Sequence, residues 1–146
     1  MKQSLSVFIL SLLISFIYSD LYAEAEHLIK PDFSKESIRS INETPGKFGN
    51  YNVDAYVVFI YQCLPCPEDA QCKPCMRDNI VISEENKKLT GYYLNSSDLV
   101  IYTSNSHDFA LSQYYKFSIT VEEDQARQNP KEAKLIGFEP ISSKNQ

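Results

Sequence analysis

The residues from Tyr51 to Gln62 constrain the fold of this chain more than any other segment. Apolar side chains fall there at every second position, which is the repeat of a β-strand: Tyr51, Val53, Ala55, Val57, Phe59 and Tyr61. The positions between them begin polar, at Asn52 and Asp54, and become apolar at Val58 and Ile60. A strand whose second face becomes buried halfway along is long and bent, as the first strand of a small closed barrel is.

Four shorter segments with the composition of strands follow the long one. Each joins β-branched, leucine or aromatic residues to polar or turn-forming residues at its ends. We predict strands over Asn79–Ser83, Asp98–Ser104, Tyr114–Glu122 and Lys134–Glu139, while Tyr92–Leu94 is either a further short strand or part of a loop. Five strands and little helix place the chain in the all-β class.

Short helices are predicted in two places. Ser34 caps a helix over Lys35–Asn42, and Thr44-Pro45-Gly46 ends that helix. Between the third and fourth strands, Ser106–Ser112 is long enough for one or two helical turns. The charged segment Glu122–Glu132, which contains an Asn-Pro pair, is predicted to be an exposed loop.

This order of elements resembles the OB-fold, a five-stranded Greek-key barrel. The segments that carry the resemblance are Gly49–Val57 for strand one and Tyr114–Val121 for strand four, and the order covers residues 34–141. It is also loosely similar to that of small secreted bacterial OB-fold proteins, which place a short helix before strand one. The resemblance implies a small five-stranded OB-like barrel, and it carries over no functional residue. The long, cysteine-rich segment between strands one and two departs from the pattern.

The N-terminus has the features of a secretory signal peptide. Lys2 precedes an apolar stretch over Leu5–Tyr18, and Ala23-Glu24-Ala25 follows with small residues at both ends. We expect cleavage between Ala25 and Glu26, which leaves a single domain over residues 26–146 with a frayed tail at 142–146. The alternative, an uncleaved anchor, needs about 20 apolar residues, and this serine-containing run is shorter. The expected location is periplasmic or secreted, and soluble after cleavage.

Length and charge exclude several classes of protein. The chain has 146 residues, 43% hydrophobic and 23% charged, which is typical of one globular domain. Its net charge is −5, and cleavage of the signal removes one basic and two acidic residues, so the mature chain stays acidic. Aromatic side chains on an OB-fold can stack with bases, and the candidates are Tyr56, Tyr102 and Tyr114. The acidic charge and the expected export argue against a nucleic-acid partner.

Four cysteines lie within 13 residues, between the first and second predicted strands. They form a C-x₂-C-x₅-C-x₂-C array of Cys63, Cys66, Cys72 and Cys75. Because an exported chain meets an oxidising compartment, we expect disulfides that shape a cysteine lobe over residues 63–78. Cys63 and Cys75 would face each other at the base of a hairpin, which favours nested Cys63–Cys75 and Cys66–Cys72 bonds. The other two pairings stay open, because a sequence does not give Cα distances.

The array has two other interpretations. Two C-x₂-C pairs can hold zinc in a Cys₄ site, although five residues between them is a short spacing and export disfavours free thiolates. Each C-x-P-C also resembles the thioredoxin active-site motif, but Pro74 and the second pair interrupt any helix after the first pair. These interpretations define the alternative function, a thiol–disulfide redox or zinc-binding protein.

The sequence favours a non-enzymatic binding protein without a cofactor. Neither histidine suits catalysis, because His27 adjoins the new N-terminus and His107 starts a predicted helix. The cysteine lobe would present a rigid surface to an envelope or extracellular protein, or to a small ligand. The candidate contact residues are Leu64, Pro65, Lys73, Pro74 and Met76 in the lobe, and Tyr56 and Tyr114 on the barrel.

Overall fold

The computed structural model describes residues 28–67, 71, 73–123 and 131–141. Along the chain they form β1 (Ser34–Lys35), α2 (Ile38–Glu43), β2 (Gly49–Tyr61), β3 (Asn79–Ser83), β4 (Asp98–Tyr102), the 3₁₀-helix η2 (Ser106–Asp108), β5 (Tyr114–Glu123) and β6 (Lys131–Pro140). The predicted signal peptide, its cleavage site and the tail at 142–146 lie outside these residues. In the described part of the chain, no helix has the length and apolar character needed to cross a membrane.

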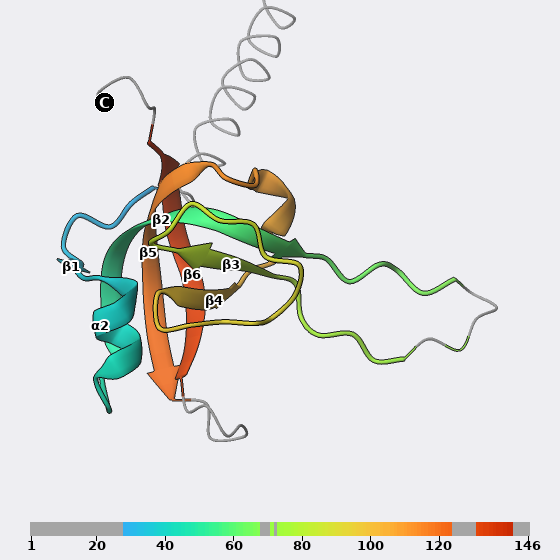
Figure 1. Ribbon diagram of the computed structural model, residues 1–146, viewed down its shortest axis with the longest axis horizontal. Helices are drawn as coiled ribbons and strands as arrows, with labels where there is room; N and C mark the ends of the chain where they lie inside the picture. The colour runs from blue at the N-terminus through green and yellow to red at the C-terminus, as the bar shows by residue number, and fades with distance from the viewer. Residues whose placement is uncertain (1–27, 68–70, 72, 124–130, 142–146) are drawn as a thin grey trace, which may run out of the picture.

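Five strands close into a mixed β-barrel (Figure 1). Their order around the barrel is β2-β3-β4-β6-β5, and β5 pairs back to β2. The N-terminal half of β2 pairs with β5 and its C-terminal half pairs with β3, both antiparallel, whereas β4 and β6 run parallel. The all-β class and the OB-like barrel predicted from the sequence are therefore confirmed. The short β1 adds to the outside of β2 in parallel.

The long strand β2 bends at a bulge between Val57 and Phe59. Val57 pairs with Ile82, and the next pair joins Phe59 to Val81, so Val58 is the extra residue. Before the bulge the predicted alternation holds, and it places Tyr51, Val53, Ala55 and Val57 in the core. After it the faces exchange: Ile60 packs on the barrel core, so the prediction that Phe59 and Tyr61 continue the same face was wrong. Val58 is only 1% exposed, which confirms that the second face of the strand becomes buried.

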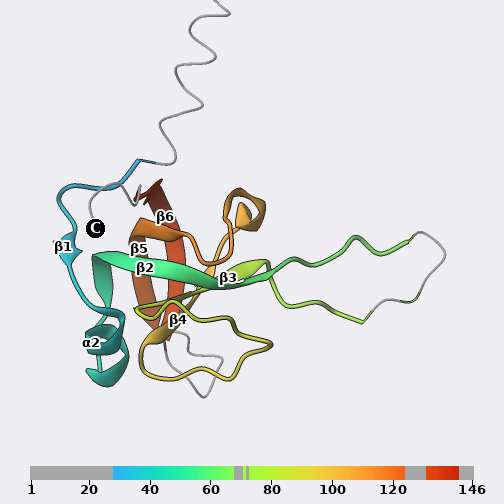
Figure 2. The same ribbon diagram turned by 45° about the horizontal axis from the view of Figure 1, so that its top comes forward.

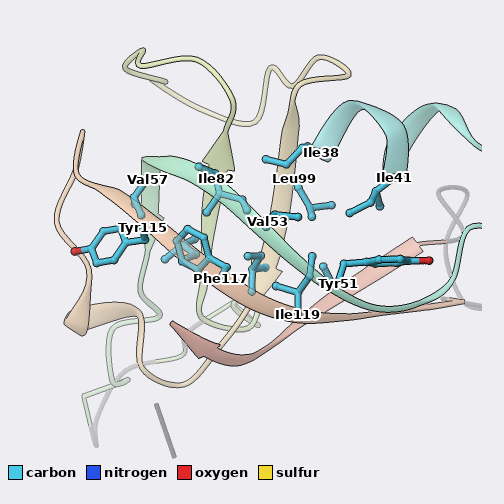
Figure 3. Packing of buried hydrophobic residues seen from close by; sticks show 14 of the residues in the cluster. Ile38, Ile41, Tyr51, Val53, Val57, Ile82, Leu99, Tyr115, Phe117 and Ile119 are labelled. Atoms are coloured by element: carbon cyan, nitrogen blue, oxygen red, sulfur yellow. The ribbon is translucent and has the colours of Figure 1, made fainter. Parts of the chain in front are cut away.

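The barrel interior is a continuous apolar core (Figure 3). Val53 and Val57 on β2 and Phe117 on the neighbouring β5 all point into the barrel interior and are at most 1% exposed. On β5 the apolar residues alternate along the sequence, and those at Tyr115, Phe117, Ile119 and Val121 are all buried. Each large apolar side chain removed from water contributes roughly 1.5–3 kcal/mol, so this core is the main stabilising feature of the barrel.

Helix α2 covers one end of the barrel, where Ile38 and Ile41 are buried in the core. Its N-cap is Ser37, whose hydroxyl accepts from the Ser40 amide. The predicted cap at Ser34 was wrong, because Ser34 and Lys35 pair with β2 as the short strand β1. Because Ser34 and Lys35 pair with the backbone of β2, the helix begins three residues later than predicted.

Other boundaries moved for similar reasons. The predicted strand Asp98–Ser104 ends at Tyr102, where β4 separates from β6, and Tyr92–Leu94 belongs to a loop. Only η2 forms within the segment Ser106–Ser112 that was predicted to be helical. Ser112, at the end of that segment, has a positive φ of 65°, which is not helical. Phe109 follows η2 and packs on Phe138, with ring centroids 4.5 Å apart. The predicted loop Glu122–Glu132 is shorter than expected, because β5 extends to Glu123 and β6 begins at Lys131.

Candidate functional site

The described residues of the cysteine lobe (63–67, 71 and 73–78) project from the barrel beyond the end of β2 and before the start of β3 (Figures 1 and 2). Its described residues from Cys63 to Arg77 are all exposed. Leu64 is 80% exposed and Met76 is 44% exposed. The predicted lobe contacts Pro65, Lys73 and Pro74 are exposed as well. Apolar side chains held away from the core in this way are available to another molecule.

A disulfide between Cys63 and Cys75 closes the base of the lobe, with the two Cα atoms 5.8 Å apart. This is the outer pair of the nested arrangement, although both cysteines lie beyond the ends of β2 and β3. Cys66 is also disulfide-bonded. Cys72 lies outside the described residues, so the Cys66–Cys72 bond stays a prediction. In this bonded state Cys63 and Cys75 have no thiolate for zinc, and no three His, Cys, Asp or Glu side chains of the described residues cluster as metal ligands.

Hydrogen bonds fix the lobe to the barrel at Asp78. Its Oδ1 accepts from the Cys63 amide at 2.7 Å, and its carbonyl accepts from the Thr103 amide at 3.2 Å. The Asn79 side chain donates to the Arg77 carbonyl at 2.8 Å. The outgoing and returning segments at the lobe base are therefore joined to each other and to the residue that follows β4.

An open cleft of about 540 Å³ lies at this base. The Arg77 guanidinium stacks over the Tyr102 ring, 4.3 Å from its centroid, and Arg77 Nη2 lies 2.7 Å from Glu132 Oε1. A second cation, Lys134, donates to Glu122 Oε2 at 2.6 Å. This hydrogen bond and the charge of Glu122 raise the pKa of Lys134 above its ordinary value. The lining residues are Arg77, Asp78, Tyr102, Thr103, Ser104, Lys134 and Leu135.

The loop over residues 84–97 adds exposed aromatic residues near the lobe. Tyr92 packs edge-on against Phe59 at 5.2 Å and donates to Asn79 Oδ1 at 2.8 Å, and its partial burial raises its pKa. Tyr93 is 88% exposed. Because Asn79 begins β3, directly after the lobe, Tyr92 ties this loop to the lobe base.

A buried ion pair holds the same loop. The Asp98 carboxylate is fully buried, and Lys87 Nζ lies 2.7 Å from its Oδ1. The Asn95 amide donates to Asp98 Oδ2 at 3.0 Å. Burial acts to raise the pKa of Asp98, but the hydrogen bonds from Lys87 and Asn95 outweigh it, so the pKa is lower than usual.

The two predicted barrel contacts, Tyr56 and Tyr114, lie against each other on neighbouring strands, with ring centroids 4.6 Å apart. Both are half-buried, and burial raises the pKa of Tyr114. Neither lines the cleft at the lobe base.

The sequence placed Leu64 and Met76 in an exposed lobe, but it did not identify Arg77 and Lys134 as site residues. Their charges were visible in the sequence, but their proximity depends on the parallel β4–β6 pair.

Comparisons with protein families, with curated proteins and with solved structures gave no match to this chain. The geometry of the lobe and its base therefore carries the functional argument. The arrangement combines an exposed cross-linked projection with a cleft that has an aromatic floor and two cations. Such a combination suits recognition of another molecule by contact.

Proposed function

We propose that this protein is an exported, non-enzymatic binding module of the OB-fold superfamily. Its cysteine lobe would present a surface to an envelope or extracellular protein. The observation that carries this proposal is the projection of the disulfide-closed lobe, with Leu64 80% exposed. A large apolar side chain in this position gains nothing for the fold of its own chain, whereas in a protein interface it would be removed from water.

The cross-link supports the same function. Ordering a mobile segment costs free energy at the moment of binding, so a segment that is shaped beforehand binds more tightly through the same contacts. The Cys63–Cys75 bond and the Asp78 hydrogen bonds supply this order at the lobe base. The order of strands around the barrel, with one parallel pair, supports membership of the OB-fold superfamily.

Photo-crosslinking in the producing cells tests the proposal. A photoreactive amino acid is placed at Leu64, at Met76 or, as a control, at Phe48. Phe48 is 39% exposed and precedes β2, so the length of that strand separates it from the lobe. We expect one defined protein adduct from the lobe positions and none from Phe48. Equal labelling at all three positions, or retention of the chain inside the cell, would overturn the proposal.

Thiol and metal measurements on the purified native protein separate this function from the redox or zinc alternative. We expect no titratable thiol before reductant is added and no bound zinc. A C-x-x-C pair that mild reductant opens readily would support redox chemistry. Stoichiometric zinc would support a Cys₄ site instead.

A further inference from the structure

The cleft at the lobe base has a lining that suits an anionic group. Its cations are Arg77 and Lys134, and the Thr103 hydroxyl accepts from the Asn105 amide, so its own proton can be donated elsewhere. The two carboxylates that pair with these cations, Glu132 and Glu122, do not line the cleft. Among the described residues, the one carboxylate that lines the cleft is that of Asp78, and it accepts from the Cys63 amide.

Arg77 is held in a defined position before any ligand arrives. The Tyr102 ring supports one face of its guanidinium at 4.3 Å, and the Glu132 contact fixes Nη2. A guanidinium has five N–H donors, and the Arg77 side chain is 57% exposed, so it can accommodate a further acceptor from the solvent side. A planar fork restrained in this way matches a carboxylate better than a flexible ammonium would.

We infer that this cleft binds a single carboxylate side chain of the polypeptide that the lobe contacts, an inference that rests on the proposed function. The carboxylate would lie between Arg77 and Lys134, and the apolar atoms next to it would pack on Tyr102 and Leu135. A polyanion is a poorer ligand, because the chain carries a net charge of −5 that repels an extended negative partner.

The strand pattern leaves space for an extended peptide at this point. The parallel ladder between β4 and β6 has only two residue pairs, and the second pair joins Tyr102 to Lys134. Beyond it β4 turns away at Thr103, while β6 continues through Leu135 to Pro140. The cleft therefore opens where two strands separate, and a partner segment could enter there.

The test is an NMR titration of the purified protein with its disulfides intact. The probes are the peptide acetyl-Val-Glu-Val-amide, its glutamine counterpart acetyl-Val-Gln-Val-amide, and inorganic phosphate. We expect the glutamate peptide to shift the amide signals of Arg77, Thr103 and Leu135, with at least tenfold tighter binding than the glutamine peptide. Equal binding of both peptides, or binding of neither, overturns the inference. If phosphate competes with the glutamate peptide at equal or lower concentration, the cleft is a general oxyanion site and the peptide-specific inference is wrong.

Variants locate the effect. Arg77→Gln should remove the preference for the glutamate peptide, and Arg77→Lys should restore only part of it, because lysine keeps the charge without the fork. Lys73→Gln, which removes an exposed lobe cation outside the cleft, should bind like the unchanged protein. If Arg77→Gln disturbs the spectrum of the barrel, Lys134→Gln replaces it. The titration does not use the lobe partner, so its failure together with a Leu64 crosslink would reject the cleft and leave the proposed function intact.

Discussion

The barrel and the cysteine lobe are stabilised by different interactions. Barrel residues such as Val57 and Phe117 have no exposed surface, whereas every described lobe residue from Cys63 to Arg77 is exposed. The barrel is therefore held by burial, and the lobe by a disulfide and by hydrogen bonds at Asp78. We therefore expect a substitution in the barrel to change the free energy of unfolding, and a substitution in the lobe to change only the lobe surface.

The largest effect is expected from truncation of the core. Phe117→Ala removes a fully buried ring from the centre of the barrel and leaves a cavity, which typically costs about 3–5 kcal/mol. Denaturant unfolding followed by circular dichroism measures this loss. Tyr93→Ala, which truncates an aromatic ring that is 88% exposed, is the matched control and should change stability by less than about 0.5 kcal/mol. Similar losses in the two variants would show that burial does not distinguish the regions.

Removal of the Cys63–Cys75 bond should cost less and act locally. The bond closes a short loop, and its loss releases conformational entropy to the unfolded chain, worth about 2–3 kcal/mol. In the Cys63→Ser/Cys75→Ser double variant, we expect unchanged NMR signals in the barrel and altered signals in the lobe. The Leu64→Ala variant, which keeps the bond, serves as the control. Collapse of the barrel spectrum would mean that the disulfide is part of the core scaffold.

The buried pair of Lys87 and Asp98 makes a smaller, pH-dependent contribution to the free energy of unfolding. Since the folded state lowers the pKa of Asp98 below its ordinary 3.8, the pair stabilises the fold above that pH. The contribution is lost as the pH falls through the lower pKa of the folded state. Asp98→Asn should therefore reduce stability by about 1–3 kcal/mol at pH 7 and flatten the dependence of stability on pH below 3.8.

Chemical denaturation at several pH values measures this effect. Glu43→Gln, which removes an exposed carboxylate at the end of α2, is the control and should keep the slope of the unchanged protein. An unchanged slope in Asp98→Asn would show that other carboxylates dominate acid unfolding.

The same contrast explains what could be predicted from the sequence. The bounds of β3, Asn79–Ser83, follow from a short apolar run between polar residues, and the inward residues of β5 follow from alternation. The sequence displays both patterns directly. The bulge at Val58 and the pairing of Ser34 with Tyr51 depend on the partner strand, which no local pattern reveals. The lobe was recognised because its cysteines are close in sequence.

The cleft could not be predicted from the sequence because its lining residues are far apart along the chain. Arg77 precedes β3 and Lys134 lies on β6, so three strands come between them along the chain, and they meet only because the barrel closes. Side chains that a local pattern cannot bring together become a site only once the order of the strands is known.

The smallest effect on stability, and the sharpest test of the comparison, is expected from Leu64→Asp. The side chain is 80% exposed, so a charge there should change the free energy of unfolding by less than about 0.5 kcal/mol. The same charge would be buried without a partner in an interface centred on the lobe, which should weaken binding by about tenfold or more. Unfolding measurements and crosslinking from Met76 can be made on the same variant, with Phe48→Asp as the control. Loss of the crosslink at unchanged stability would show that the lobe serves binding alone, whereas loss of stability would show that Leu64 supports the fold.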